Sequence, residues 1–182
     1  MNFELSEEQK MIQQSVERFV QENYDLPKRV EISSKDPGYS KDYWNSMAEL
    51  GWLGLPFSEK DGGFGGNQID TLVIMEQFGK GLVLEPFLAN IVLGGGAIQM
   101  GGSEELKNEM LSSLIEGSKQ LTLAYAEQQS RFDLEDVATS ARKEEGEKYI
   151  INGQKSMVLN AESADHLVVV TRTNGGQVDE EG

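Results

Sequence analysis

The stretch GSKQLTLAYAEQ, residues Gly117–Gln128, marks the place where the chain changes its hydrophobic period. Before it, apolar residues recur every three or four positions, as on one face of a helix. Within it, Leu121, Leu123 and Tyr125 alternate with polar or small residues, which is the period of a β-strand. The sequence therefore predicts an α+β protein whose helical part ends near Ser118 and is followed by a β part.

Residues 1–118 predict an N-terminal all-helical domain. Ser6 and Gln9 match a capping box, and apolar residues at helical spacing follow it over about residues 7–22. The other helices are predicted over about residues 41–50, after Asp70 as an N-cap, from Pro86, and after Ser103.

Residues 119–182 predict a sheet of about four strands. The segment KYIINGQKSMVL is typical of a hairpin, because Asn152 and Gly153 can supply the two positive-φ residues of a type I′ turn. A further strand is predicted at HLVVVTRT, with a second turn at Asn174 and Gly175. Since the sequence stops at Gly182, the sheet would keep an open edge, and we expect this second domain to be incomplete.

The composition excludes several classes of function. The chain of 182 residues has 31 acidic and 16 basic residues, and its formal charge of -15 disfavours nucleic-acid and anionic membrane partners. Without cysteine and with the single His166, no disulfide, no metal site and no histidine-based triad is predicted. The start, MNFELSEEQK, lacks the features of a secretory signal, so a cytoplasmic location is expected.

Two glycine-rich stretches resemble phosphate-binding loops but lack essential parts. In LGLPFSEKDGGFGG, Leu53–Gly66, Gly63 and Gly65 match half of a dinucleotide fingerprint, yet the third glycine falls at Gln68 and no strand precedes it. In GAIQMGGS, Gly102 stands where a phosphate loop requires lysine. We interpret the first stretch as a connection between helices and reject a nucleotide triphosphatase.

Two acidic residues could act on a ligand, and each has a simpler alternative. Glu127 follows the first predicted strand and could orient a ligand, or it could be a solvated strand end. Glu85 could lie at the bottom of an apolar pocket, or it could favour the first turn of the helix from Pro86.

The order of these features resembles the acyl-CoA dehydrogenase family, flavoproteins that form a trans double bond between C2 and C3 of an acyl thioester. The resemblance covers the entire chain and rests on the phrases LGLPFSEKDGGFGG, LVLEPFLANIVLGGG, RFDLEDVATSAR and ADHLVVVTRTNGG, which look closest to the pimeloyl-CoA dehydrogenase small-subunit type. It implies a helical domain over residues 1–118 and the first part of an antiparallel middle β-barrel over residues 119–182. The family's C-terminal four-helix bundle would lie beyond Gly182.

The resemblance implies FAD against the first strand of the middle domain and the strand after the Asn-Gly turn. The implied cofactor-binding residues are Leu123, Tyr125, Ala126, Met157, Val158 and Leu159. The family usually has threonine at the position of Ala126 and threonine or serine at that of Leu159, so two hydroxyls that would bind the flavin edge are missing. Each such hydrogen bond contributes about 0.5 to 1.5 kcal/mol net, so their loss weakens FAD binding without excluding it.

The helix from Pro86 resembles the family's helix at the acyl pocket. The residues that could line an acyl chain are Phe87, Leu88, Ile91 and Val92, with room left by Gly94–Gly96. An ordinary core helix is the equal alternative. The family's catalytic base is a glutamate on the C-terminal bundle or near it, so no catalytic residue is assigned in this chain.

Our hypothesis is that the chain is the N-terminal portion of an FAD-dependent acyl-CoA dehydrogenase of fatty acid β-oxidation, inactive by itself. The implied partners are an acyl-CoA substrate, an electron-transfer flavoprotein, and further subunits of a homo- or hetero-oligomer. One alternative is a non-catalytic, flavin-free structural subunit of a hetero-oligomeric acyl-CoA dehydrogenase, which the missing hydroxyls favour. A second is a free-standing helical interaction module with a disordered β segment.

Overall fold

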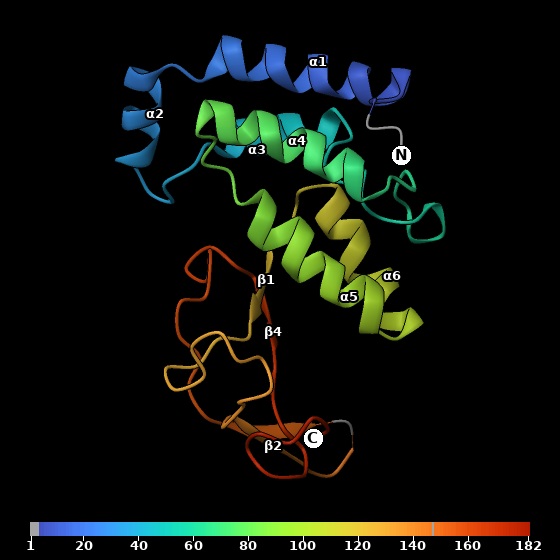
Figure 1. The fold of residues 1–182 in the computed structure, drawn as a ribbon, viewed down its shortest axis with the longest axis vertical. Helices are drawn as coiled ribbons and strands as arrows, with labels where there is room; N and C mark the ends of the chain where they lie inside the picture. Colours follow the sequence, from blue (N-terminus) through green and yellow to red (C-terminus); the bar gives the residue numbers. More distant parts are fainter. Residues whose placement is uncertain (1–3, 147) are drawn as a thin grey trace.

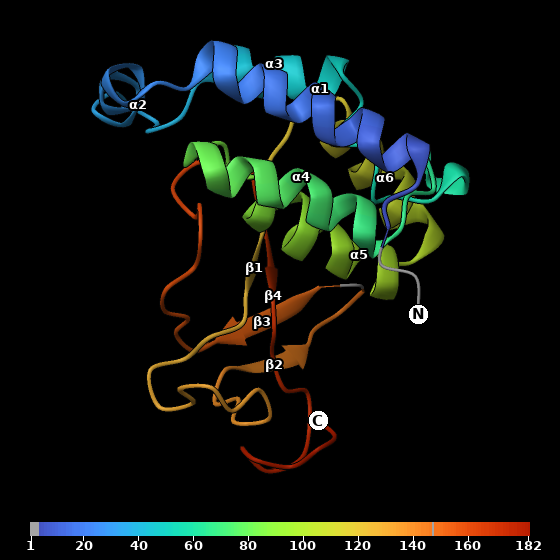
Figure 2. The same ribbon diagram turned by 45° about the horizontal axis from the view of Figure 1, so that its top comes forward.

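The computed structural model describes residues 4–146 and 148–182, in which a helical part is followed by a smaller β part. In Figure 1 the helices fill the upper part of the molecule, and the strands with their long loops lie below them. The two parts meet where a helix and a strand from the middle of the sequence lie next to each other, as Figure 2 also shows.

The helical part is built around one apolar core. Helix α1 (Glu7–Asn23) lies along α4 (Gln68–Gly81), and α3 (Lys41–Glu49) and α6 (Glu104–Ile115) complete the packing. The capping box of Ser6 and Gln9 and the N-cap Ser103 are confirmed. The largest fully buried apolar side chains of this core are Phe57, Phe87, Met47, Leu53, Ile74, Ile91, Leu111, Leu114 and Val16.

Two helix starts differ from the prediction. Helix α2 (Leu26–Ser33) was not predicted, because it buries no side chain and therefore has no apolar period, although Asp25 caps it. Helix α4 is capped by Asn67 and not by Asp70. Asp70 is the third helical residue, and its buried carboxylate accepts hydrogen bonds from the Asn67 N–H at 2.6 Å and from Gln9 at 2.9 Å.

The helix predicted from Pro86 contains a π-helical segment, η2 (Leu88–Gly95), which continues into α5 (Gly96–Gly101). Of the three glycines expected to leave room, Gly94 and Gly95 do not. A Cβ at Gly94 would lie 2.9 Å from the Leu121 carbonyl oxygen, and one at Gly95 would lie 2.5 Å from the Phe57 ring. These two glycines allow close packing of the helix, whereas a Cβ at Gly96 would meet open space.

The glycine-rich stretch before α4 connects helices, as predicted, and includes the short 3-10 helix η1 (Glu59–Asp61). Gly62 and Gly65 have φ angles of 86° and 67°, which favour glycine. This loop therefore reverses the chain by left-handed backbone conformations.

The β part differs most from the prediction. Strand β1 (Leu121–Ala124) pairs in parallel with β4 (His166–Val169), and β2 (Ser140–Lys143) pairs antiparallel with β3 (Tyr149–Asn152). The described residues thus form two separate two-stranded sheets, which are small and do not close into a barrel. The antiparallel arrangement that the family resemblance implied is wrong for β1 and β4, and a period-2 pattern by itself does not reveal which strands pair.

The hairpin predicted at Asn152 and Gly153 is also absent from the described residues. Strand β3 ends at Asn152, and residues 153–165 contain no strand. Gly153 does not have a positive φ, and a Cβ there would lie 2.5 Å from Thr139 Oγ1. Glycine is therefore needed for close approach to the neighbouring chain and not for a turn. The hairpin that forms joins β2 to β3.

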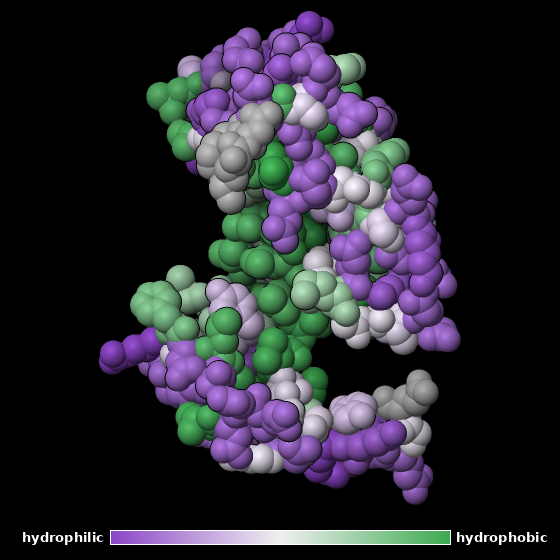
Figure 3. Space-filling model, turned by 45° about the vertical axis from the view of Figure 1, so that its right-hand side comes forward, coloured by the Kyte–Doolittle hydropathy of each residue, from purple (hydrophilic) through white to green (hydrophobic). Residues whose placement is uncertain are grey.

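Buried polar contacts join the two parts. The fully buried Asn90 of η2 accepts a hydrogen bond from the Leu121 N–H at 2.7 Å, and Gln120 donates to the Tyr39 hydroxyl at 2.5 Å. Hydrophobic side chains gather in the hollow between the helical part and the β part (Figure 3). The position of β1 is thus fixed by helix η2.

Candidate functional site

The two segments predicted to contact a flavin lie side by side. Strand β1 has β4 on one edge, and residues 155–159 run along the segment that contains β1 and its continuation. The Ser156 N–H donates to the Ala126 carbonyl at 2.9 Å, and the Thr122 hydroxyl donates to the Leu159 carbonyl at 2.6 Å. Contrary to the prediction, residues 155–159 are not a strand.

This surface, which we call the β1 surface, consists of the six predicted flavin contacts, Leu123, Tyr125, Ala126, Met157, Val158 and Leu159. Its large side chains are accessible: Tyr125 is 43% exposed, Met157 87% and Leu159 50%. Within the described residues, the backbone N–H groups of Ala126, Met157 and Val158 donate to no protein acceptor. The surface therefore offers apolar contact area together with unused backbone donors.

A buried ion pair fixes the end of this surface. The Glu127 carboxylate accepts hydrogen bonds from Lys155 at 2.6 Å, from Gln129 at 2.7 Å, and from the Ala138 and Thr139 N–H groups at 2.9 and 3.0 Å. Burial acts to raise the pKa of Glu127, but the hydrogen bonds from Lys155, Thr139 and Gln129 outweigh it and hold the pKa well below its usual range. Glu127 is thus neither a solvated strand end nor an available base.

A cavity of about 410 Å³ adjoins the β1 surface. We call it the β1 pocket, and its lining residues are Leu93, Leu123, Tyr125, Ser130, Arg131, Asp133, Leu134 and Val170. Arg131 has a φ of 51° and Met157 a φ of 54°, in the left-handed region that residues other than glycine rarely adopt. One strained backbone position therefore lies within the β1 surface, at Met157, and another lies beside it, at Arg131. Such strain is concentrated at functional sites in proteins.

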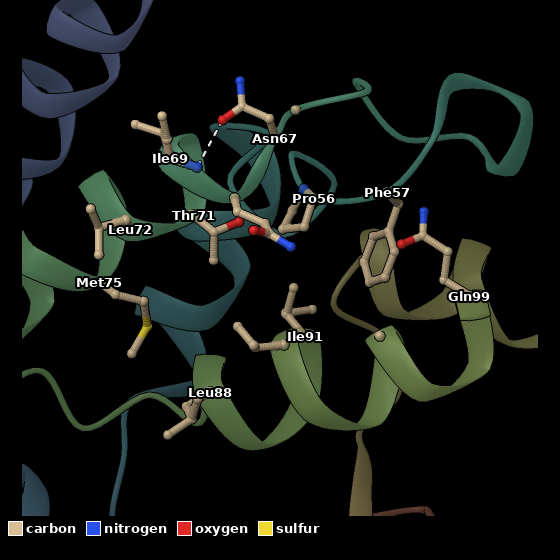
Figure 4. A pocket seen from close by; sticks show the side chains of 14 residues that line it. Pro56, Phe57, Asn67, Ile69, Thr71, Leu72, Met75, Leu88, Ile91 and Gln99 are labelled. Carbon is tan, nitrogen blue, oxygen red and sulfur yellow. Dashed lines mark hydrogen bonds between the residues drawn. The ribbon is translucent and has the colours of Figure 1, made fainter. Parts of the chain in front are cut away.

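The predicted acyl-contact residues lie elsewhere. Leu88, Ile91 and Val92 line a separate groove of about 840 Å³ between α4 and η2, opposite Leu72 and Met75 (Figure 4). We call it the α4–η2 groove. Phe87 is buried in the core, where its ring meets that of Phe78 edge to face at 5.5 Å. The structure therefore does not bring these residues to the β1 surface.

Glu85 joins three segments of the helical part. Its carboxylate accepts hydrogen bonds from the Tyr24 hydroxyl, after α1, and from the Ser40 N–H at 3.1 Å, before α3. Burial raises the pKa of Glu85, and burial together with the Glu85 hydrogen bond raises the pKa of Tyr24. Glu85 also borders a cavity of about 330 Å³, as one alternative in the sequence analysis expected, but that cavity has no lining residue in common with the β1 pocket.

Of the residues that line the β1 pocket, sequence reasoning found only Leu123 and Tyr125, and it missed Leu93, Ser130, Arg131, Asp133, Leu134 and Val170. Leu93 belongs to a helix that is apolar almost throughout, so no periodic pattern predicts which side of the helix packs against β1. One signal was available in Asn90, a polar residue inside this apolar helix, which faces β1. Val170 reaches the pocket because β4 pairs with β1, whereas Arg131 reaches it from the turn that follows β1.

Family models match both parts of the chain. The acyl-CoA dehydrogenase N-terminal domain matches residues 6–118, and the acyl-CoA dehydrogenase middle domain matches residues 122–182. The chain belongs to the acyl-CoA dehydrogenase family. The β part is therefore related to a middle domain of that family, which disagrees with a helical interaction module whose β segment is disordered.

Individual relatives agree with this membership. The chain is 31% identical over 181 residues to a probable acyl-CoA dehydrogenase, YngJ, of Bacillus subtilis, covering 98% of this chain and 47% of that protein. It superposes on the FAD complex of PigA with a TM-score of 0.84 at 30% identity, covering 97% of this chain and 46% of that one. The ChsE4-ChsE5 complex from Mycobacterium tuberculosis gives a TM-score of 0.85 at 22% identity, covering 96% of this chain and 46% of that one, and shows a shared fold. The chain thus spans about half the length of these relatives.

FAD is used in this family, as the PigA complex illustrates, and the residues of the β1 surface fit such a group. Tyr125, Met157 and Leu159 provide exposed apolar area for a planar ring, and unused backbone N–H groups can donate to its polar edge. In the described part of the chain, no helix has the length and apolar character needed to cross a membrane.

Proposed function

We propose that this chain is the N-terminal portion of an FAD-dependent acyl-CoA dehydrogenase and that its β1 surface binds the flavin. The supporting observation is the placement of residues 123–126 beside residues 157–159, joined by the Ser156–Ala126 and Thr122–Leu159 hydrogen bonds. When bound, FAD would supply the acceptor for a hydride from the β-carbon of an acyl thioester.

The residues of this chain would bind and orient, and we assign no proton transfer to them. Leu88, Ile91 and Val92 remain proposed acyl contacts for a chain that reaches the α4–η2 groove. Glu127 is held ionised by four donors and Glu85 is bound to Tyr24, so neither is suited to remove the α proton. We therefore propose that the isolated chain has no turnover.

The finer assignments are proposals that rest on the family resemblance. The chain would divide into a helical domain (residues 1–118) and a β domain (residues 119–182). It would be of the pimeloyl-CoA dehydrogenase small-subunit type and would take part in fatty acid β-oxidation in the cytoplasm. Electron transfer would go to an electron-transfer flavoprotein, and the complete protein would be a homo- or hetero-oligomer.

The test is FAD binding by the purified protein, followed by its visible spectrum and by quenching of flavin fluorescence. We expect saturable binding that becomes stronger in the variants Ala126→Thr and Leu159→Thr, which restore the missing hydroxyls. One added hydrogen bond of about 0.5 to 1.5 kcal/mol corresponds to roughly a twofold to tenfold tighter Kd. Val30→Thr on the exposed face of α2 is a matched control that should leave the Kd unchanged.

The second candidate is a non-catalytic, flavin-free subunit of a hetero-oligomeric acyl-CoA dehydrogenase. The absent hydroxyls favour it, as do the exposed apolar side chains of β3, where Tyr149, Ile150 and Ile151 are each 41% exposed or more. A colourless protein that binds no added FAD, with or without the restored hydroxyls, would establish this candidate against the first.

A further inference from the structure

Arg131 lies at the edge of the β1 pocket without a protein partner. Within the described residues its guanidinium makes no hydrogen bond and no ion pair, and it is the one basic residue among those that line the pocket. The other lining residues include the apolar Leu93, Leu123 and Val170. In a chain with a formal charge of -15, an unpaired arginine beside an apolar cavity is a local exception to the prevailing negative field.

The backbone at Arg131 is held in an unfavourable conformation. Its φ of 51° lies in the left-handed region, where a residue with a Cβ is disfavoured relative to glycine. The turn is fixed on both sides: the Ser130 hydroxyl donates to the Glu127 carbonyl at 3.0 Å, and the Asp133 N–H donates to the Ser130 carbonyl at 2.8 Å. Glycine would fit this position with less strain, so arginine here lowers the stability of the fold.

We propose that Arg131 is an anion-binding residue of the β1 pocket, which recognises a phosphate group on a nucleotide-bearing ligand. A planar guanidinium donates two parallel hydrogen bonds to such an oxyanion, and no competing acidic partner within the described residues holds Arg131. The phosphate can come from the pyrophosphate of FAD or from coenzyme A. The inference rests on the proposed function for the identity of these two ligands.

Asp133 also borders the pocket and opposes an anion. Its Oδ1 accepts a hydrogen bond from the Glu135 N–H at 3.0 Å, which ties the carboxylate to its own loop. A negative charge so placed would weaken phosphate binding without neutralising Arg131. Asp133→Asn, which keeps the oxygen acceptor and removes the charge, should therefore strengthen binding.

The decisive variant is Arg131→Gly, because stability and binding should change in opposite directions. Removing the left-handed strain should raise the urea midpoint of unfolding, whereas loss of the guanidinium should weaken phosphate binding about tenfold or more. Arg131→Lys keeps the charge but not the paired donors and should bind with intermediate affinity. Arg142→Gln, on β2, is the matched control and should change neither property.

The ligands used as probes identify the source of the phosphate. Kd values are measured for FAD and riboflavin, and for coenzyme A and pantetheine, at two salt concentrations. Weaker binding of FAD but not of riboflavin assigns Arg131 to the flavin pyrophosphate, and weaker binding of coenzyme A but not of pantetheine assigns it to the coenzyme A phosphates. If the wild type binds FAD or coenzyme A and Arg131→Gly binds both equally well, the inference is overturned and the proposed function stands. If the wild type binds neither, both are overturned.

Discussion

Glu127 and Lys155 show how single residues hold the candidate site together. The exposed fractions of their side chains are 2% and 7%, and the pair joins the end of the β1 segment to residues 155–159. Two buried charges are tolerated here because the carboxylate has backbone and side-chain donors in addition to the ammonium group. Either charge left alone would lack its buried counter-charge.

We expect Lys155→Met to destabilise the protein by about 3 to 5 kcal/mol, because it leaves a buried carboxylate without its counter-charge. The double variant Glu127→Gln/Lys155→Met should lose less, since no buried charge then remains. Urea unfolding at pH 7 measures both values. A single variant no less stable than the double would show that the pair is not buried in solution.

The same pair predicts a pH dependence. The folded-state pKa of Glu127 lies below the unfolded value of about 4.3, so its stabilising contribution is complete above that pH and is lost as the pH falls toward the folded pKa. The difference in unfolding free energy between wild type and Glu127→Gln should therefore shrink as the pH falls below about 5. Glu85→Gln is the matched comparison with the opposite trend, because the folded-state pKa of Glu85 is raised. A difference that stays constant with pH would contradict the assignment.

At the scale of elements, the contact between η2 and β1 positions both the β1 surface and the β1 pocket. Gly94 lets the helix approach the Leu121 carbonyl, and Asn90 pairs with the Leu121 N–H at the same place. Helix and strand therefore approach closely enough at this place for direct contact with the Leu121 backbone. Any added atom at Gly94 must separate them.

Two neighbouring glycines test this contact. Gly94→Ala should destabilise the protein by about 1 to 3 kcal/mol, because its Cβ would collide with backbone that cannot move freely. Gly96→Ala, in the same continuous helix but facing open space, should stabilise it by about 0.5 to 1 kcal/mol. Thermal or urea unfolding separates these outcomes, and equal effects at both positions would refute the close contact.

Across the whole molecule, buried apolar side chains are concentrated in the helical part and are fewer in the β part. The core cluster lies in the helical part and at Leu121, whereas β3 is exposed along its length and long loops connect the strands. Segments with few buried contacts open most readily, so the β part should have the lower local stability.

Limited trypsin digestion should therefore cut first after Arg131, in the exposed turn that follows β1, and cut after Arg18 in α1 only later. Mass spectrometry of the early fragments identifies the bond. Early cleavage within α1 or α4 would contradict this order of stability.

The sequence by itself determined the family, the capped helices α1 and α6, and the change from helix to strand near Ser118. These features rest on caps, turns and periods within a few residues, which short stretches of chain specify locally. The tertiary structure decided that β1 pairs in parallel with β4, that Gly153 packs against Thr139, and that Leu93 lines the β1 pocket while Leu88, Ile91 and Val92 line the α4–η2 groove. These outcomes depend on contacts between distant segments, and neither period nor composition encodes which distant segment a given face will meet.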